Sequence, residues 1–471
     1  MQIPSTLATR YASREMCAIW SPEAKILLER KLWIAVLKAQ KELGLAIDAS
    51  AIKDYEKVLE KIDLASIDAR EKELRHDVKA RIEEFNALAG HQIIHSGMTS
   101  RDLTESVEAL QIKEALLLVH NKYVAILAGF GSRAGEFIDQ PIAGRSHNVP
   151  AQVTTVGKRF ATFAEEGLFA FNRLEDLLAR LPLRGLKGPV GTAQDALDLF
   201  NGDSTKLAKL DSEVATHLGF DNVLDSVGQI YPRSFDFDVV SALLQLAAAP
   251  SNMATTLRLM AGAELATEGF KKGQVGSSAM PHKMNARSSE RINGFTVLLR
   301  GYVTAISELA GSQWNEGDVA CSVVRRVVLP DSFYAIDGLL ETALTVLGEL
   351  GIFERAISAE LDRNLPFLAT TKILMAAVKN GVGRESAHEV IKEHSLAAVR
   401  NIQNGGANDL LQRIAADSRI PLDLPALEAL IAAPLDFTGV AREQTLQVIA
   451  KVAKVTARYP KAANYQPGAI R

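Results

Sequence analysis

Cysteine is scarce in this sequence, which contains only Cys17 and Cys321. The two stand far apart and form no CxxC pair, which excludes a disulfide framework and a cysteine-based structural zinc site. So few cysteines are typical of a protein from a reducing compartment. We therefore expect a cytoplasmic protein.

Long apolar runs are absent as well. No stretch of about 18 apolar residues occurs, and residues 1–20 lack a basic segment followed by an apolar one. Neither sign of charge dominates, because 53 Lys and Arg residues face 56 Asp and Glu residues, for a net charge of −3. We therefore expect no signal peptide, no membrane span and no charged surface for nucleic acid or an anionic membrane.

Strand patterns are few, and the lack of βαβ alternation disfavours a Rossmann or barrel fold. The 471 residues, 47% of them hydrophobic and 23% charged, indicate a folded multidomain protein. Apolar periodicity predicts an all-α fold class. The predicted long helices cover residues 22–45, 101–137, 153–177, 236–267 with a break at Pro250, and 286–309.

Three helical domains are predicted, at residues 1–115, 116–365 and 366–471. The stretch LPLRGLKGPVGTAQ, residues 181–194, is a predicted loop because it holds two prolines and three glycines. A proline-containing break near Leu365 separates the long helices from shorter ones that follow.

The most unusual segment is GQVGSSAMPHKMNARSSE, residues 273–290. Small residues interrupt helical sequence there, Pro281 ends a preceding helix, and Asn285 is a candidate cap for a helix starting near Ala286. A helix N-terminus beside Lys283 is suited to binding an anion. A surface linker between two helices is the alternative interpretation.

Three other polar segments compete with this loop: RHD at residues 75–77, His91 and His95 before GMTS, and His147 in AGRSHNVP. On a helix, His91 and His95 would share one face and could bind a metal, but no third ligand and no HExxH acid occur nearby. Hydrogen-bonded structural histidines are the alternative. The residues alone predict a mostly helical enzyme for an anionic substrate.

The loop GSSAMPHKMN, residues 276–285, resembles the signature loop of the fumarase/aspartase superfamily, GSS-x-MP-x-K-x-N. Its Ala-Met-Pro-His-Lys form is most similar to that of the adenylosuccinate lyases. Other segments resemble blocks of that family in the same order: LATRYASREMCAIW, RHDVKA, HSGMTSRDLTE, AGRSHNVPAQVTT and SVVRRVVLPDS. The resemblance spans most of residues 5–335.

This resemblance implies a central long-helix bundle that joins those of other copies into a twenty-helix core of a homotetramer, with active sites composed from three subunits. It implies β-elimination of fumarate from adenylosuccinate, giving AMP, and from succinyl-aminoimidazole-carboxamide ribotide in purine synthesis. The expected partners are these small-molecule purine nucleotides and further copies of the chain. No cofactor and no metal are expected.

The resemblance also implies catalytic roles. Ser277 matches the base, and a serine hydroxyl needs a dry, cationic setting for that role, which Lys283 would provide. His147 matches the general acid, and Glu290 matches the carboxylate that orients its ring. An exposed helix residue without a catalytic role is the alternative for Glu290.

The remaining matches are substrate-binding positions, some of them suited to phosphate or carboxylate groups. They are Arg10, Tyr11, Arg75, His76, Asp77, His95, Thr99, Ser100, Gln229, Ser278, Met284, Asn285, Ser322 and Arg326. We expect Arg10, His95 and Arg326 to contact the anionic groups.

The chain departs from its relatives at several positions. Relatives often have Arg-Thr-His-Gly where this chain has RSHN at residues 145–148, and a proline where it has Ala286. In WNEGD, residues 314–318, Gly317 stands where an arginine is expected near substrate anions. Arg325, where relatives often have glutamate, is a candidate to restore that charge.

Two alternative assignments remain for the sequence. Carboxymuconate cycloisomerase has a similar loop but a substrate without phosphate, so the matches at Arg10, Tyr11 and the RHD triplet disfavour it. A noncatalytic structural relative would have lost an acid or a base. Here Ser277, His147 and Lys283 are all present.

Overall fold

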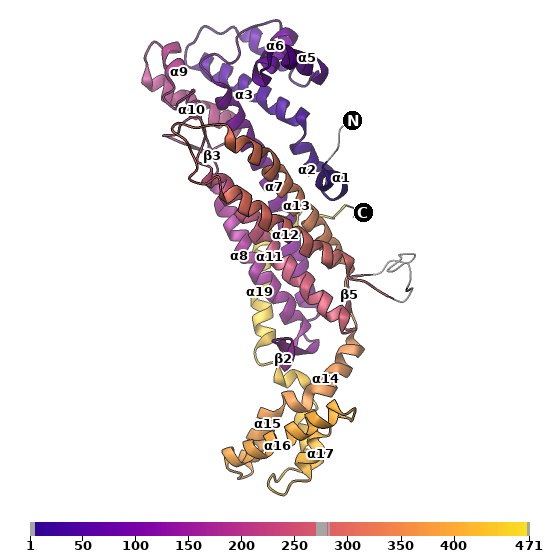
Figure 1. Ribbon diagram of the computed structural model, residues 1–471. Coiled ribbons are helices and arrows are strands. Elements are labelled where there is room, and N and C mark those ends of the chain that lie inside the picture. Colours follow the sequence, from indigo (N-terminus) through magenta and orange to yellow (C-terminus); the bar gives the residue numbers. More distant parts are fainter. Residues whose placement is uncertain (1–4, 270–279, 281–282, 469–471) are drawn as a thin grey trace.

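The computed structural model describes residues 5–269, 280 and 283–468 of the chain. This part forms an elongated and almost entirely helical molecule (Figure 1). Long helices run along its middle section, shorter N-terminal helices form one end, and a group of short helices late in the chain forms the other.

Six helices build the N-terminal part, and each begins at a Ser, Asp or His whose side chain accepts a backbone hydrogen bond. Local sequence therefore determines where these helices start. They are α1 (Thr6–Arg10), α2 (Arg14–Ile19), α3 (Pro22–Glu42), α4 (Ala49–Lys57), α5 (Leu64–Leu74) and α6 (Asp77–Ala89).

Five long helices form the middle section: α7 (Ser100–Glu136), α8 (Val156–Ala179), α11 (Ser234–Gly262), α12 (Arg287–Ser307) and α13 (Ala320–Glu349). Two short helices, α9 (Gln194–Leu199) and α10 (Ser204–Leu218), lie between α8 and α11 in the chain. Among the described helices, α7 alone is long and apolar enough to cross a membrane, and 67% of its most apolar window is buried inside the protein. Packing in the core therefore accounts for its composition.

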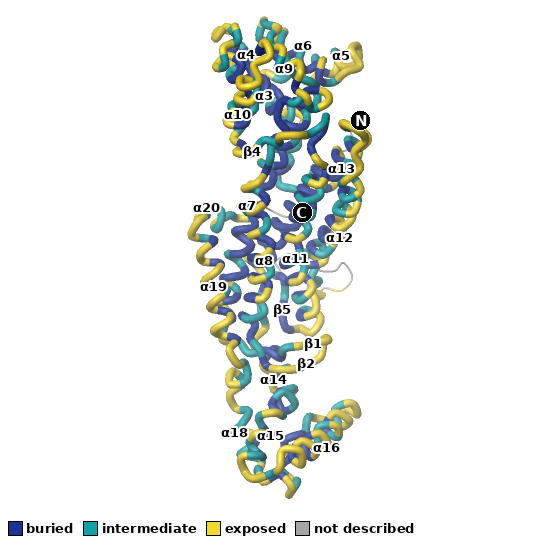
Figure 2. The backbone as a smooth tube through the Cα atoms, turned by 90° about the vertical axis from the view of Figure 1, so that its left-hand side faces the viewer, coloured by how far each residue is buried: buried dark blue, intermediate teal, exposed yellow. Residues whose placement is uncertain are grey.

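The main hydrophobic core runs through this middle section, where Figure 2 shows most of the buried residues. From Phe333 to Ala343 nearly every side chain of α13 is buried, because α7, α11 and α12 pack around it. A helix covered on several sides needs apolar residues on most of its surface. The exceptions in this stretch include Asp337 and Glu341, which lie four positions apart and both pair with the buried Lys122 of α7.

The predicted break at Pro250 is wrong, because α11 continues through it from Ser234 to Gly262. A proline inside a helix removes one hydrogen bond and strains the preceding turn. Pro250 is buried where α11 packs against α8, α12 and α13. Tertiary packing therefore maintains a helix that local propensity would interrupt.

A separate, smaller core unites the short helices α15–α18. The helices at this end of the molecule are α14 (Glu354–Leu368), α15 (Thr370–Lys379), α16 (Arg384–Gln403), α17 (Leu410–Ala415) and α18 (Leu424–Ile431), followed by a 3₁₀ turn (Pro434–Phe437). The chain then returns to the middle section through α19 (Ala441–Arg458) and α20 (Pro460–Ala463), which pack against α7 and α8. The predicted domain boundary after residue 115 lies inside helix α7, which continues across it. The predicted domain boundaries stay a prediction.

The few strands among the described residues form three two-stranded pairs, two of them only two residues long. The longest pair is the antiparallel hairpin of β1 (Pro141–Ser146) and β2 (Val149–Thr155). The others are β3 (Pro182–Leu183) with β4 (Asn222–Val223), and β5 (Ala266–Thr267) with β6 (Gly351–Ile352). The predicted all-α fold class is confirmed.

Candidate active site

His147 lies at the tip of the β1–β2 hairpin. It forms the two-residue turn with Asn148, and their φ angles of 52° and 63° are the left-handed pair that a tight hairpin turn requires. Arg145 braces this turn by donating to the Asn148 carbonyl oxygen over 3.0 Å and by pairing with Glu360 of α14. The structure therefore exposes the His147 imidazole at the end of a braced turn.

The segment before α12 carries several of the predicted residues. Ser277 and Ser278 lie outside the described residues. Four others line one cavity of about 940 Å³, whose opposite wall is the C-terminal end of α11: Lys283, Met284, Asn285 and Glu290. The structure thus places a lysine, an amide and a carboxylate around a single cavity.

The N-terminus of α12 is capped differently from the prediction. Asn285 does not cap it; the helix begins after Ala286, which makes no side-chain cap bond. The Glu268 carboxylate instead accepts hydrogen bonds from the backbone N–H groups of Ser288 and Ser289, both at 2.8 Å. The anion position at this helix end is therefore taken by a carboxylate of the chain itself.

The RHD triplet occupies the corner between α5 and α6. Arg75 ends α5 in a left-handed conformation, and His76 caps α6 by accepting a hydrogen bond at Nδ1 from the Lys79 N–H over 3.3 Å. Asp77 accepts a hydrogen bond from Arg81 over 3.2 Å. Arg75 and His76 are exposed, and Nε2 of His76 remains for a ligand.

His91 and His95 lie in the non-helical connection between α6 and α7. The alternative that His91 and His95 bind a metal required both to lie on one face of a helix. That helix is not formed. His95 Nδ1 accepts a hydrogen bond from the Trp33 indole over 3.1 Å. Burial, with smaller contributions from His76 and Lys79, lowers the pKa of His95 to about 4. At neutral pH, His95 is therefore uncharged, and its predicted contact with anionic groups would be a hydrogen bond donated through Nε2.

The lowered pKa of His95 predicts acid sensitivity. The unfolded chain binds a proton at His95 below about pH 6.5, whereas the folded protein binds it only near pH 4, so the free energy of unfolding falls as the pH drops through this interval. The loss attributable to His95 reaches up to about 3 kcal/mol, at about 1.4 kcal/mol per pKa unit. Urea unfolding of wild type and His95→Gln at pH 7, 5.5 and 4 measures it. An equally steep fall in the variant would contradict the assignment.

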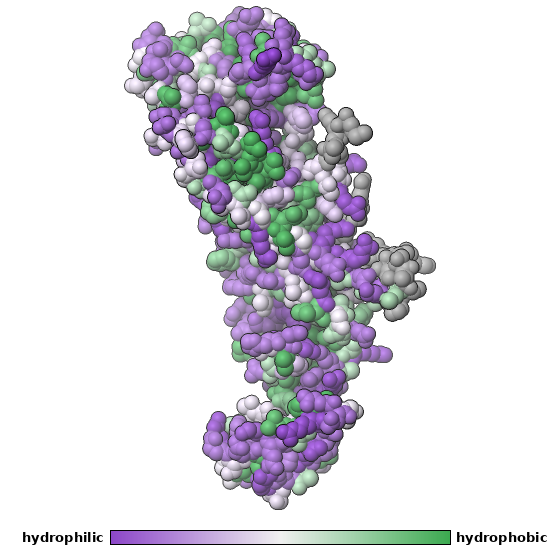
Figure 3. All heavy atoms as spheres, in the orientation of Figure 1, coloured by the Kyte–Doolittle hydropathy of each residue, from purple (hydrophilic) through white to green (hydrophobic). Residues whose placement is uncertain are grey.

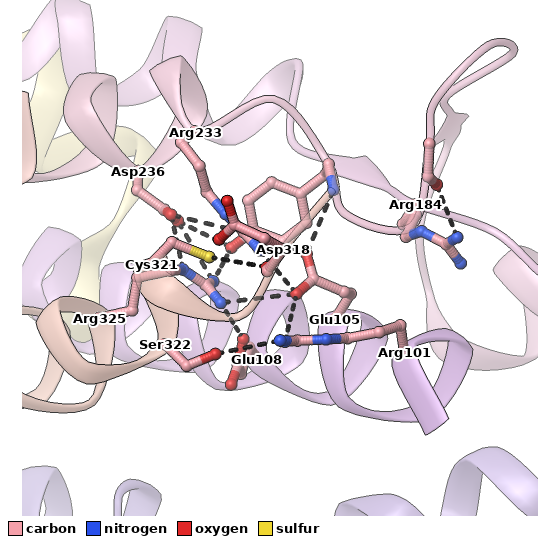
Figure 4. Close-up of polar contacts among 12 residues, drawn as sticks. Arg101, Glu105, Glu108, Arg184, Arg233, Asp236, Asp318, Cys321, Ser322 and Arg325 are labelled. Carbon is pink, nitrogen blue, oxygen red and sulfur yellow. Dashed lines mark hydrogen bonds and ion pairs between the residues drawn. The ribbon is translucent and has the colours of Figure 1, made fainter. Parts of the chain in front are cut away.

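The start of α7 gathers further predicted residues. Thr99 precedes the helix, and its N–H donates to the Asp102 carboxylate over 2.7 Å, which fixes the first turn. Ser100 is the first residue of that turn. Arg101 donates to the Ser322 hydroxyl over 3.0 Å, so the beginning of α13 lies against the beginning of α7 (Figure 4).

Gln229 lies in the same region. Its N–H donates to the Glu316 carbonyl oxygen over 2.6 Å, and Arg184 joins Gly228 to Asp102 of α7. The structure thus brings Thr99, Ser100, Gln229 and Ser322 into one neighbourhood.

Gly317 has a backbone reason for being glycine. Its φ is 139°, and a Cβ there would meet the side chains of Gln229 and Ile230 at 3.3 Å. An arginine at this position would therefore be strained in this chain.

The hypothesis that Arg325 replaces the missing surface charge is wrong. Arg325 is buried and bonds to Asp236, Glu108 and the Tyr231 hydroxyl (Figure 4). Burial by itself lowers the pKa of the guanidinium, but Asp236 and Glu108 together raise it well above its ordinary value. The positive charge of Arg325 is therefore paired with carboxylates inside the protein. Arg326, one position on, is exposed.

Arg10 and Tyr11 line another cavity, of about 690 Å³, together with Arg291 of α12. The Arg10 and Arg291 guanidinium groups lie 5.8 and 5.4 Å from the centroid of the Tyr11 ring, whose edge meets Phe295. Arg291 was not predicted. Its signal in the sequence was its place directly after Glu290, near the start of α12.

These groups of residues lie apart within one chain. Tyr11 packs against α13 at Gly338, whereas Ser322 and Arg326 lie near the start of that helix. At 1.5 Å per residue, Arg326 and Gly338 are about 18 Å apart. The two groups of predicted substrate-binding residues are therefore well separated along one chain.

Comparison with known proteins decides the family. The sequence pattern described as "Lyase" matches residues 11–301, and "Adenylosuccinate lyase C-terminus" matches residues 366–448. The adenylosuccinate lyase of Saccharomyces cerevisiae is 36% identical over 94% of this chain and 93% of its own length. The chain belongs to the adenylosuccinate lyase family. The Schizosaccharomyces pombe adenylosuccinate lyase is 35% identical over the same shares of the two chains.

Solved structures show the same fold. The 3-carboxy-cis,cis-muconate lactonizing enzyme of Pseudomonas putida superposes with a TM-score of 0.83 over 96% of this chain and 99% of that one, at 18% identity. A fumarate lyase from Mesorhizobium sp. BNC1 gives 0.80 over 94% and 98%, at 20% identity. At such identities the likeness establishes the fold alone, and the assignment to adenylosuccinate lyases depends on the closer relatives.

Proposed function

We propose that this member of the adenylosuccinate lyase family eliminates fumarate from adenylosuccinate, giving AMP, and from succinyl-aminoimidazole-carboxamide ribotide in purine synthesis. The observation that carries the proposal is the 36% identity to an adenylosuccinate lyase across 94% of the chain. The match of residues 366–448 to the C-terminal pattern of the same family supports it.

The direct test is the reaction itself. Purified protein incubated with adenylosuccinate should change the absorbance of the purine and release AMP and fumarate in equal amounts. The second substrate should release fumarate in the same way. If neither compound is cleaved while a carboxymuconate is cyclised, the cycloisomerase alternative is correct.

We infer a two-sided elimination. A base removes the proton beside a carboxylate of the succinyl group, and an acid protonates the leaving nitrogen on the opposite face. Ser277 is the proposed base and His147 the proposed acid, with Glu290 orienting the imidazole. The exposure of His147 at a braced turn supports this role, since it can approach a substrate held outside its own chain.

Lys283 and Asn285 are the proposed partners of the succinyl carboxylates and of the dianionic intermediate. Their position on one cavity with Glu290 supports this role. The α12 N-terminus adds no free anion site in this structure, because Glu268 occupies it.

The remaining binding assignments are also proposals. Arg10, Tyr11, Ser322 and Arg326 are proposed partners of the nucleotide phosphate. The other proposed substrate-binding residues are Arg75, His76, Asp77, His95, Thr99, Ser100, Gln229, Ser278 and Met284.

We further propose a cytoplasmic homotetramer with active sites shared between chains. The separation of the binding groups along one chain supports it, as does the exposure of large apolar side chains on three central helices. Figure 3 shows apolar side chains gathered on this face of the middle section. The exposed apolar residues of α11, α12 and α13 include Leu259, Val297, Leu298, Val323 and Val327.

Shared sites predict complementation. His147→Ala and Ser277→Ala should each be inactive as pure proteins, but their mixed tetramers contain some sites with both groups intact. Activity should therefore return after subunit exchange, to at most about a quarter of the wild-type level if subunits mix at random. Absence of recovery after exchange verified by mass spectrometry would contradict the shared site.

A further inference from the structure

A third cavity lies behind the His147 turn, and none of the proposed catalytic residues lines it. Its volume is about 530 Å³, within the range of small-ligand sites. Charged side chains from four elements line it: Arg145 of β1, Arg159 of α8, Arg258 of α11 and Glu360 of α14. Three guanidinium groups thus face a single carboxylate.

Arg159 is the unusual member of this set. The one hydrogen bond that the structure assigns to it, among the described residues, joins Nη1 to the thioether sulfur of Met260 at 3.3 Å. A thioether is a weak acceptor and carries no charge. Burial lowers the pKa of the Arg159 guanidinium. The negative charge of Glu360 partly offsets this decrease, and the positive charge of Arg145 adds to the decrease.

Glu360 does not neutralise Arg159 by contact. Its Oε1 pairs with Arg145, and its buried Oε2 has no hydrogen-bond partner among the described residues. Arg145 in turn is committed to Glu360 and to the Asn148 carbonyl oxygen. Arg258 is exposed, and Asn293 accepts one of its hydrogen bonds at 3.0 Å.

Arg159 is half-buried at the wall of the cavity, so its guanidinium loses part of its hydration without gaining a carboxylate partner, and an anion bound in the cavity would compensate for this. We propose that this cavity is a second anion-binding site, in which Arg159 and Arg258 bind a small dianion of the phosphate or dicarboxylate class. Bound there, the anion contacts the base of the hairpin whose tip carries His147. Arg258, Leu259 and Gly262 line both this cavity and the cavity at Lys283, so the two adjoin, whereas Arg159 is not among the residues that line the cavity at Lys283. The proposal does not rest on the proposed function.

The probes are inorganic phosphate and fumarate, titrated separately into the full-length protein while the melting temperature is followed. Each anion should raise the melting temperature of the wild-type protein if it binds. The separate titrations show whether the site takes phosphate or a dicarboxylate. Arg159→Gln should weaken the binding of the effective anion at least about tenfold, the usual effect of losing a charged hydrogen-bond partner.

The matched control is Lys158→Gln, which removes the same charge from the neighbouring position of α8 without lining the cavity. It should respond to the anion like wild type. Arg159→Lys, which keeps the charge, should retain part of the response. Without anion, Arg159→Gln should melt at or above the wild-type temperature, because an unpaired charge has been removed from a desolvated position.

Two results would overturn the proposal. One is an unchanged anion response in Arg159→Gln. The other is a response lost in Arg326→Gln but kept in Arg159→Gln, which would place the anion at the proposed nucleotide phosphate position. Cleavage of adenylosuccinate is measured separately, so failure of this site and failure of the proposed function are distinguishable.

Discussion

Ser277→Ala is expected to lower turnover of adenylosuccinate by a factor of about 100 or more while leaving the affinity for AMP nearly unchanged. The proposed reaction requires removal of a weakly acidic proton, and loss of the group that accepts it typically costs 10²–10⁴ in rate. The alanine removes one oxygen and changes no other residue. Steady-state kinetics and equilibrium binding of AMP separate the two effects.

Ser278→Ala is the matched control, since it makes the same chemical change at the next residue. As a proposed substrate-binding position, Ser278 should affect the Michaelis constant more than turnover. Wild-type turnover in Ser277→Ala, with a large loss in Ser278→Ala, would move the base by one position. Wild-type turnover in both variants would remove the two serines from the mechanism.

Arg325→Gln is expected to destabilise the protein by about 3–5 kcal/mol, the usual loss when one partner of a buried ion pair is removed. The variant leaves the buried Asp236 carboxylate without its 2.7 Å bond to Nε of Arg325 and also deprives Glu108 of its partner. Arg233 contacts Asp236 only at 3.8 Å, so it does not replace the lost bond. The midpoint of urea unfolding at fixed protein concentration measures the effect.

Arg326→Gln makes the same change one residue later on the same helix, at an exposed position. Its stability should equal that of wild type, while its affinity for AMP should fall about tenfold if Arg326 binds the phosphate. The opposite pattern, a destabilised Arg326→Gln and a stable Arg325→Gln, would reverse the two roles. Unchanged affinity in a stable Arg326→Gln would remove it from the binding site.

The positions of many of the helices could be predicted from local sequence alone. The predicted helices at 22–45, 101–137 and 286–309 correspond to α3, α7 and α12 within a few residues. Periodicity and capping residues act over a few positions, so they can be read directly from the chain. Pro250 shows the limit of such reading, because the packing of three helices around it outweighs the local preference to end α11.

The same limit applies to the candidate site. The loop sequence identified the family and placed Lys283, Asn285 and Glu290 together, but it could not show that Glu268 caps α12 from 20 positions earlier. The adjacent arginines Arg325 and Arg326 look equivalent in sequence. Only packing shows that one is buried and the other exposed.

The sequence by itself determined the all-α class, the family and its reaction, since these follow from periodicity and from a motif of ten residues. Only the tertiary structure showed which charged side chains are already paired with other groups of the protein. Arg325 and Asp236 lie 89 positions apart, and Arg159 and Met260 lie 101 apart. Whether a charge is paired depends on desolvation and on atoms that meet only when distant segments pack, and no local pattern encodes that meeting.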